Sequence, residues 1–411
     1  MNIFYRILDD VSKNYNIYFI IMSATLPNLN DYTNKDFASE LIQNHREYFN
    51  HDVFKRNDFV FVVGTFDITS LMKYFQEKII TIHQEENKFL IVVNTIKSSI
   101  EIFKQLNYSQ LNQKFKIFLL NSYVSGKDRN NIIKYIKNSQ NDKIILVSTQ
   151  SIEAGVDLDF DIGLRDKATL DSIEQVAGRI NRECNLSKNK VSKLYIFDLN
   201  NESRIYRNDL RFKLLSDINI DEQKDILNNK RFEFYYKKYF DKVKNIFSSA
   251  KRCDYIIELE KLNFDKIHTD LNIIEKRWSI RLIFDFINRN TFEDKILCFF
   301  DKYAIKVVKD LLALKKEKSG FEFKPYLKVI DKIIDKNSIC IDFFDSSSKD
   351  KFLDFIKDKG HFISEISPDT VIIHLGFKEK YIKQYVIDGI EYNYLDLSDL
   401  MNDFKNHSKS I

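Results

Sequence analysis

Short apolar runs alternate with amphipathic segments between about residues 58 and 200, and this rhythm predicts strands and helices in alternation. The apolar runs predict strands over 59–63, 89–93, 115–120, 144–148 and 193–198. The amphipathic segments predict helices over 68–84, 98–106, 129–137 and 170–181. Because the strands are continuously apolar, we expect an α/β fold with a mostly parallel sheet that helices cover on both faces.

The pattern differs on either side of this region. Before it, helical spacing over 3–11 precedes a buried strand at 17–22 (IYFIIM), and a further helix is expected near 37–48. After about residue 200 the chain is charged, aromatic and helix-rich up to 314. Strand-like runs then follow at 338–344, 370–375 and 385–387, which predicts a helix-rich α+β accessory region over 201–411.

Composition narrows the class of protein. A chain of 411 residues with 44% hydrophobic and 30% charged residues is typical of a globular protein with two or three structural units. Its net charge of +4 permits a nucleic-acid groove but does not by itself indicate one. The four cysteines form no CxxC pair, and no apolar run approaches the ~20 residues of a membrane span. We expect a cytoplasmic protein without a metal site.

One motif, QVAGRINR at 175–182, carries phosphate chemistry. On a continuous helix, the side chains of Gln175, Arg179 and Arg182 would share one face. Two guanidinium groups on one face suit a polyphosphate, because each presents planar donors to phosphate oxygens. The alternative is a basic helix face in solvent.

A second motif, VSTQSIEAGVDLDFD at 147–161, follows a predicted strand directly. This is where α/β sheets place their ligand sites. Thr149 can donate to a nucleic-acid phosphate, and Gly155 permits close backbone approach. Asp157 can orient an arginine or contact a nucleotide. For the acidic residues, the alternative is an ordinary polar turn.

In order and spacing, these segments resemble motifs V and VI of superfamily-2 helicases. Ser23, Ala24 and Thr25 look like motif III, and VVNT at 92–95 corresponds to the motif IV region. The sequences SATLP, VVNT and TQSIEAGVDLDFD resemble the corresponding motifs of CRISPR-associated Cas3 helicases. Arg129, in GKDR, fits a position where family members often carry an arginine. The resemblance covers residues 17–200 and suggests the C-terminal part of a Cas3 helicase, beginning just after its DExH box.

The resemblance implies a RecA-like fold and a role for each motif. Residues 1–53 would be a remnant of the first RecA-like lobe and a linker, 54–200 the second lobe, and 201–411 the accessory domain. Gln175, Arg179 and Arg182 would be catalytic, and Gly155 and Asp157 would join both arginines in binding the nucleotide. The nucleic-acid contacts would be Ser23, Thr25, Asn94, Thr95, Thr149 and Gln150.

The 411 residues contain neither a GxxxxGK[ST] phosphate loop nor a DExH box. Superfamily-2 motors need both for hydrolysis. We therefore expect ATP and Mg²⁺ to be held only in an assembled two-lobe motor, with no turnover by this chain alone. The implied partners are single-stranded DNA, a Cascade-type CRISPR surveillance complex and a polypeptide carrying the missing lobe.

Three alternatives remain open at this stage. The chain could be a non-catalytic fragment that binds DNA or Cascade, or a nonfunctional remnant of an interrupted gene. The main alternative activity is that of an RNA helicase, and only the sequences of the motif IV and V segments, by their resemblance to Cas3, argue against it.

Overall fold

The fold is described from a computed structural model. It describes residues 55–183 except 140 and 154, then 191–200, 206, 209–249, 294–299, 301–314 and 320–408 except 344–345, 361, 368–369 and 374. Before residue 55 it describes 8, 11–15, 17–23, 25, 30, 39, 41 and 42. The chain forms two compact units: residues 1–59, 168–175 and 206–291 make one, and 60–167, 176–205 and 292–411 the other.

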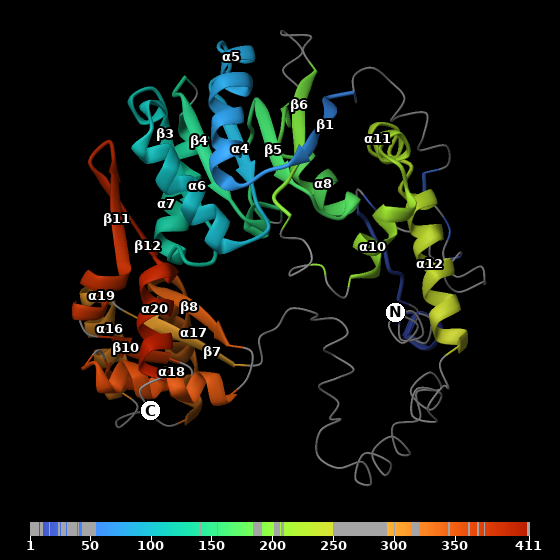
Figure 1. Ribbon diagram of the computed structural model, residues 1–411. Helices are drawn as coiled ribbons and strands as arrows, with labels where there is room; N and C mark the ends of the chain where they lie inside the picture. The colour runs from blue at the N-terminus through green and yellow to red at the C-terminus, as the bar shows by residue number, and fades with distance from the viewer. Residues whose placement is uncertain are drawn as a thin grey trace. The chain divides into compact units, whose positions relative to one another are not determined.

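A six-stranded sheet lies at the centre of the predicted α/β region, with helices packed against it (Figure 1). Its strand order is β1-β6-β5-β2-β4-β3, and β2 pairs in parallel with both β4 and β5. Its elements are β1 (Asn57–Thr65), α4 (Ile68–Tyr74), a π-helical turn (Phe75–Ile79), α5 (Ile80–Ile82), β2 (Lys88–Val92), α6 (Ile96–Tyr108), β3 (Lys116–Leu120), α7 (Gly126–Asn138), β4 (Ile144–Ser148), β5 (Ile162–Asp166), α8 (Leu170–Ala177) and β6 (Ser192–Asp198). The predicted fold class is confirmed.

Burial explains the apolar strands. Every residue of β4 and β5, and all but the first of β2 and β3, is buried. A strand covered on both faces has no solvent side, so its sequence need not alternate. Among these strands, β5 was not predicted from the sequence, although it lies between β6 and β2.

Helix α8 ends earlier than the sequence predicted. Its last helical residue is Ala177, not Asn181. Beyond it, Ile180 forms a parallel β-bridge with Phe160. The Phe160 N–H donates to the Arg179 carbonyl, and the Asn181 N–H donates to the Phe160 carbonyl. Asn181 then has a φ of +48°, which no α-helix allows. The expected helical face shared by Gln175, Arg179 and Arg182 is therefore wrong.

The first compact unit contains α10 (Leu210–Lys213), α11 (Ile220–Asn228) and α12 (Phe232–Ser249). Arg211 holds α10 to the first turn of α8 through an ion pair with Asp171 (2.7 Å). Lys230, after α11, donates to Glu174 (2.7 Å). Burial raises the pKa of the Glu174 carboxyl, and Lys230 opposes that effect.

The apolar run at 17–22 is not a strand. The described residues 17–23 have no regular secondary structure, and the side chains of Ile17 to Met22 are between 39% and 87% exposed. A strand needs a neighbour for its backbone groups, and no described segment provides one here. In the helix expected over 3–11, Leu8 is described and helical, as are 11–15, whereas most of 37–48 lies outside the described residues.

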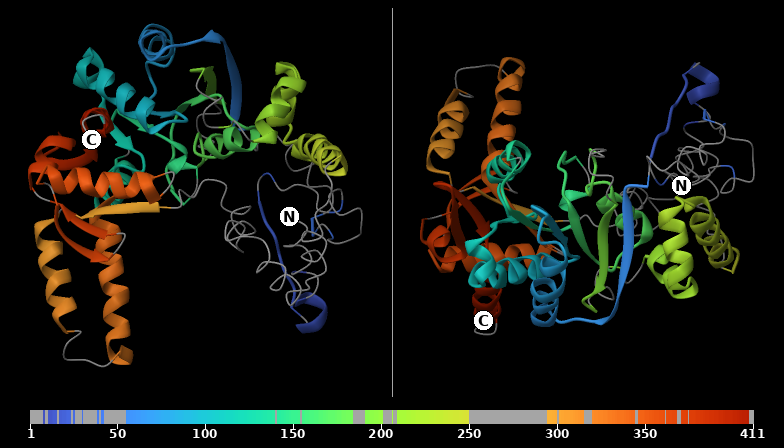
Figure 2. Two further views of the ribbon diagram at one scale, coloured as in Figure 1. Left: turned by 60° about the horizontal axis from the view of Figure 1, so that its bottom comes forward. Right: turned by 90° about the horizontal axis from the view of Figure 1, so that it is seen from above.

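The C-terminal elements combine helices and strands, as predicted. A four-stranded sheet has the order β8-β7-β10-β9 and joins antiparallel and parallel pairs. Helices α16 and α17 lie side by side (Figure 2) around buried Val308, Ile330 and Ile334. The bounds are β7 (Asp294–Phe299), α16 (Lys302–Ala313), α17 (Gly320–Asn337), β8 (Ser338–Phe343), α18 (Ser346–Asp358), β9 (Phe362–Ser367), β10 (Thr370–Ile373), α19 (Leu375–Tyr381) and α20 (Leu397–Ser408).

A C-terminal hairpin, β11 (Ile382–Ile387) and β12 (Ile390–Leu395), packs on the six-stranded sheet at β3. Strand β3 stands at one end of the sheet, where backbone groups lack a strand partner. The Tyr385 hydroxyl accepts from the Leu119 N–H (3.3 Å), and its ring lies 4.8 Å from that of Phe103. The hairpin thus covers an edge that would otherwise be open.

Within the described residues, the helices are all too short or too polar to cross a membrane.

Candidate functional site

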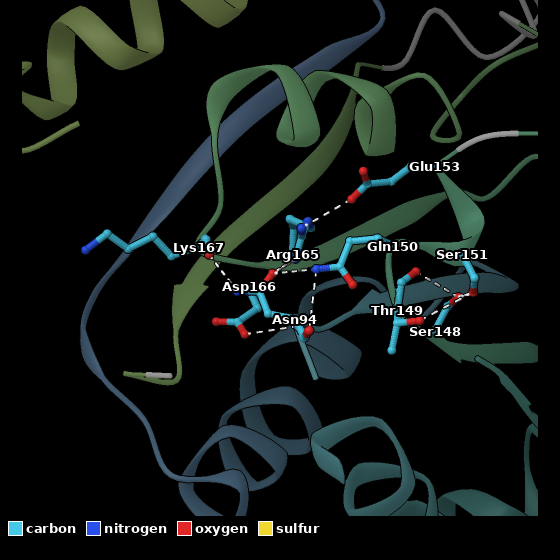
Figure 3. Close-up of polar contacts among 9 residues, drawn as sticks. All are labelled: Asn94, Ser148, Thr149, Gln150, Ser151, Glu153, Arg165, Asp166 and Lys167. Carbon is cyan, nitrogen blue, oxygen red and sulfur yellow. Dashed lines mark hydrogen bonds and ion pairs between the residues drawn. The ribbon is translucent and has the colours of Figure 1, made fainter. Parts of the chain in front are cut away.

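The candidate site lies where the parallel strands end. Strands β2, β4 and β5 run in register, so their carboxyl ends meet at one edge of the sheet. Asn94 follows β2, and Thr149 and Gln150 follow β4. Three residues predicted to contact nucleic acid are thereby brought to one edge, as Figure 3 shows.

Asn94 lies at the centre of this edge and is only 5% exposed. Its side-chain amide donates to the Lys167 carbonyl (2.7 Å), and its own N–H donates to the Asp166 carboxylate (3.3 Å). Gln150 reaches it from the next loop, with Nε2 lying 3.4 Å from the Asn94 carbonyl oxygen. Asn94 therefore joins the ends of β2 and β5 to the loop after β4.

Arg165, in strand β5, is completely buried. Its Nη1 donates to Oδ1 of Asn94 (2.7 Å), and its Nη2 lies 3.2 Å from Oε1 of Glu153 (Figure 3). A buried charge is tolerated only when it is paired and hydrogen-bonded. Arg165 thus connects the segment 92–95, through Asn94, to the segment 147–161, through Glu153.

Two predicted contact residues use their hydroxyl groups inside the protein. Thr149 is 6% exposed, and its Oγ1 lies 3.4 Å from Oγ of Ser151. Thr95 is the N-cap of α6, where its Oγ1 accepts from the Ser98 N–H (2.9 Å). A cap of this kind satisfies one of the free N–H groups at the start of a helix.

Arg179 holds the loop between β4 and β5. Its Nε donates to the carbonyl of Ile152 (3.1 Å), and its Nη2 to the carbonyl of Glu153 (2.8 Å). Partial burial lowers the pKa of its guanidinium, as does the nearby charge of Arg182. The two carbonyl contacts fix the backbone of the residue whose side chain meets Arg165.

Arg182 is exposed and faces a small charged cluster. Its Nη1 lies 3.3 Å from Oδ1 of Asp157, and Lys137 of α7 approaches the other oxygen of that carboxylate (2.6 Å). Lys137 first, and Arg182 with it, holds the pKa of Asp157 below its ordinary range. The Arg182 backbone N–H donates to the Asp159 carboxylate (2.7 Å), which fixes the turn that carries this arginine.

Two further residues shape the same loop. Gly155 has a φ of +71°, and a Cβ built on it would meet nothing within 4 Å. Its requirement for glycine is therefore conformational and not a matter of close approach. Arg129, on α7, donates to the Ser151 carbonyl (2.9 Å), so the loop is held from a second side.

Ser23, Thr25 and Gln175 belong to the other compact unit. The Thr25 N–H donates to Oγ of Ser23 (3.3 Å), and Thr25 is 6% exposed. Gln175 is exposed near the end of α8.

Sequence reasoning missed four residues of the site: Arg165, Asp166, Glu153 and Lys137. A signal was present for the first two, because Arg165 and Asp166 are adjacent charges that close the segment IGLRD. Charged residues are almost never fully buried unless they are paired. Because the sequence analysis did not predict strand β5, it did not recognise Arg165 and Asp166 as buried charged residues.

Two groups of polar side chains result. At the carboxyl edge, amide and hydroxyl groups are held in fixed positions by contacts within the protein, with Gln150 partly exposed beside them. Near the first residues of β2 and β5, Arg182 and Lys137 lie beside the Asp157 carboxylate, and guanidinium groups bind phosphate well. The sheet, with its parallel strand pairs and covering helices, defines an α/β lobe.

Part of the chain is similar to CRISPR-associated nuclease/helicase Cas3 proteins. Residues 85–185 match the family model of CRISPR-associated nuclease/helicase Cas3, C-terminal. The Cas3 of Methanothermobacter thermautotrophicus is 35% identical over 107 residues, which are 26% of this chain and 12% of the relative. The Cas3 of Haloferax volcanii is 44% identical over 72 residues, 17% of this chain and 8% of the relative.

The crystal structure of T. fusca Cas3 aligns with 82% of this chain and 40% of its own, at 15% identity and a TM-score of 0.46. The matched segments span about an eighth or less of the length of the curated relatives. The family model and both relatives show that part of this chain is similar to the C-terminal part of Cas3 proteins. The matched residues include Asn94, Thr149, Arg165 and Arg179.

Proposed function

We propose that this chain is the second-lobe half of a Cas3-like, ATP-dependent single-stranded DNA helicase or translocase in CRISPR antiviral defence. One observation carries the proposal. Gln150 and Glu153 lie in one short loop after β4: Gln150 contacts Asn94 at the end of β2, and Arg179 donates to the carbonyl of Glu153. This is the arrangement expected if nucleic-acid contact and nucleotide contact are linked.

In this proposal, Asn94, Thr95, Thr149 and Gln150 contact the DNA backbone. Amide and hydroxyl donors bind phosphate oxygens without reading base sequence, as a motor that moves along a strand requires. Ser23 and Thr25 add a contact from the motif III segment. The Cascade-type surveillance complex is the proposed source of the DNA strand, in the cytoplasm.

In this proposal, Arg179 and Arg182 act on ATP from the second lobe, and Gly155 and Asp157 contact the nucleotide. Gln175, in the other compact unit, keeps its predicted catalytic role. ATP hydrolysis supplies the free energy for translocation, and an arginine near the γ-phosphate stabilises charge in the transition state. The donors fit this role, because Arg182 is exposed and Asp157 orients it. We assign Mg²⁺ to the other lobe, because in such motors the acidic DExH box binds it.

A separate or upstream first lobe completes the motor. The 411 residues include no GxxxxGK[ST] loop and no DExH box, and these elements hold phosphate and Mg²⁺ in such motors. The exposed side chains of Ile17 to Met22 form an apolar surface. An exposed apolar run of this kind is typical of a surface that a partner covers.

Binding of single-stranded DNA by this chain tests the nucleic-acid half of the proposal. We expect a fluorescent oligonucleotide to bind, with competition by single-stranded DNA stronger than by RNA of the same sequence. Gln150→Ala should weaken binding by about tenfold, the effect of losing one hydrogen bond to a charged group. Gln105→Ala, at the far end of α6, is the matched control and should leave binding unchanged.

Equal loss in the Gln150 and Gln105 variants would contradict the assigned contacts, and preference for RNA would favour an RNA helicase. A non-catalytic binding fragment is the second candidate function, and the missing phosphate loop favours it. It predicts the same DNA binding without any ATP turnover in the presence of a first lobe.

A further inference from the structure

Arg165 occupies a position that the proposed function does not explain. It is a fully buried cation in the third strand of the sheet, with a side chain that bridges Asn94 and Glu153. A buried ion pair is a poor source of stability, since well-packed apolar residues of similar volume often replace one without loss. The fold alone therefore gives little reason for an arginine here.

The two partners of Arg165 face different parts of the site. Asn94 belongs to the nucleic-acid side, where Gln150 also approaches it (3.4 Å). Glu153 belongs to the nucleotide side, because Arg179 donates to its carbonyl (2.8 Å). A continuous series of contacts thus runs from Asn94 through Arg165 and Glu153 to Arg179.

The geometry of the guanidinium suits a bridge between two acceptors. Nη1 meets Asn94 and Nη2 meets Glu153, so the planar fork fixes the separation and orientation of both. Lysine carries the same charge on one ammonium group and cannot reproduce this fork. Asp166, the next residue, accepts from the Asn94 N–H and from the Leu199 N–H (3.2 Å), which keeps the end of β5 in place.

We propose that Arg165 is a positioning residue that couples the nucleic-acid contact at Asn94 to the nucleotide-side loop that Arg179 holds. A displacement of the Glu153 backbone moves its carboxylate, and Arg165 transfers that movement to Asn94. The inference rests on the proposed function for the identity of the two ligands. The contact series itself does not depend on either ligand.

A double-mutant cycle on the full chain tests this coupling, with hydrogen exchange as the readout. Arg179→Ala should speed exchange in the peptide that contains Asn94 by at least about fivefold, the lower end of typical coupling. In an Arg165→Met/Glu153→Met background, which removes both charges together, Arg179→Ala should leave that peptide unchanged. Arg165→Lys should fold and also lose the coupling.

A second readout is the affinity for a single-stranded DNA oligonucleotide in the same variants. Arg179→Ala should weaken binding by about fivefold or more in the wild-type background and have no effect in the Arg165→Met/Glu153→Met background. Arg211→Met, which removes an ion-paired arginine from the other compact unit, is the control and should change neither readout.

The outcomes separate the two ideas. If Arg179→Ala changes hydrogen exchange and DNA affinity equally in the wild-type and Arg165→Met/Glu153→Met backgrounds, the coupling is overturned. The proposed function still stands in that case, provided that the chain binds DNA. Retention of full coupling by Arg165→Lys would also overturn it, because charge and not the fork would then be sufficient. If the chain does not bind DNA, but Arg179→Ala still changes hydrogen exchange at Asn94 only when Arg165 and Glu153 are present, the proposed function is rejected and the coupling through Arg165 stands.

Discussion

Arg179 and Arg182 come from one motif but have different surroundings. Arg179 is half-buried and donates to two backbone carbonyls, whereas Arg182 is exposed beside Asp157. The first is therefore part of the structure of the loop. The second lies at the surface, where the proposed function assigns it to the nucleotide.

Substitution should separate these roles. Arg179→Ala removes two charged hydrogen bonds and should lower the free energy of unfolding by roughly 1.5–3 kcal/mol. Arg182→Ala removes a surface ion pair and should cost no more than about 0.5 kcal/mol. Urea denaturation of both variants measures the difference. Equal costs would contradict the surroundings described for the two arginines.

Asp128 is a buried carboxylate at the start of α7. It is 5% exposed, and its Oδ2 accepts from the Ser125 hydroxyl (2.9 Å). Burial raises the pKa of this carboxyl above its ordinary value of 3.8, and the hydrogen bonds from Ser125 and Asn393 only partly oppose that effect. Ionisation of Asp128 therefore works against the folded state.

The sign of the pH dependence follows from that direction. A raised folded-state pKa gives stability that is complete below the unfolded value and is lost as pH rises through the folded value. Asp128→Asn should therefore gain stability relative to wild type as pH rises above about 4. Asp388→Asn should show the opposite sign, because Lys116 lowers the pKa of Asp388. Melting curves between pH 3 and pH 8 compare them.

At the scale of single residues, the sequence predicted site residues that lie within recognised motifs. It did not predict those whose role depends on tertiary contacts. Asn94, Thr149 and Gln150 were predicted because they stand in segments that resemble helicase motifs IV and V. Arg165 was missed because its importance depends on contacts with Asn94 and Glu153, which are distant in sequence. A local pattern does not contain those contacts.

At the scale of elements, strands were predicted where apolar residues were continuous. Strand β5 was missed because Gly163, Arg165 and Asp166 interrupt its apolar character. A Cβ at Gly163 would lie 2.7 Å from Cδ1 of Leu194 and 2.9 Å from Cδ1 of Ile180, so both side-chain ends would have to shift. Helix α8 was extended too far because its periodicity continues past Ala177, whereas the bridge between Ile180 and Phe160 ends it.

The β11–β12 hairpin is held by aromatic contacts. Tyr392 is fully buried, with its ring 5.6 Å from Phe118 of β3 and 5.3 Å from Tyr385. Its hydroxyl is buried without a hydrogen-bond partner among the described residues. Burial raises the pKa of this hydroxyl to about 12. The ring is thus the stabilising part of the side chain.

Tyr392→Phe should therefore leave the stability unchanged or raise it by up to about 1 kcal/mol, since it removes an unsatisfied polar group. Tyr392→Ala should cost roughly 3–5 kcal/mol by opening a cavity. Thermal unfolding of the two variants measures both effects. A clear loss of stability in Tyr392→Phe would show that the hydroxyl does have a partner.

At the scale of the whole molecule, the sequence predicted an α/β region followed by a mixed α+β region. It did not predict that residues 292–411 would form a compact unit with 60–167. That grouping depends on long-range contacts, such as the Leu395 N–H donating to the Tyr123 carbonyl (3.0 Å). Periodicity reports local structure and carries no information on such contacts.

The proposed motor also has a requirement at this scale. Its second lobe carries Arg179 and Arg182, and the phosphate loop and DExH box must come from a first lobe. In the proposed motor, that lobe would cover the exposed apolar side chains of Ile17 to Met22. The central claim is therefore that this chain supports ATP turnover only with a partner.

ATP hydrolysis in the presence of single-stranded DNA tests that claim most directly. The chain would be assayed alone and with a polypeptide that carries a Cas3-type phosphate loop and DExH box. The account predicts no turnover alone, turnover with the partner, and loss of at least about a hundredfold in Arg182→Ala, with Arg231→Ala as an unaffected control. Turnover by the chain alone would contradict the account, and so would a silent mixture.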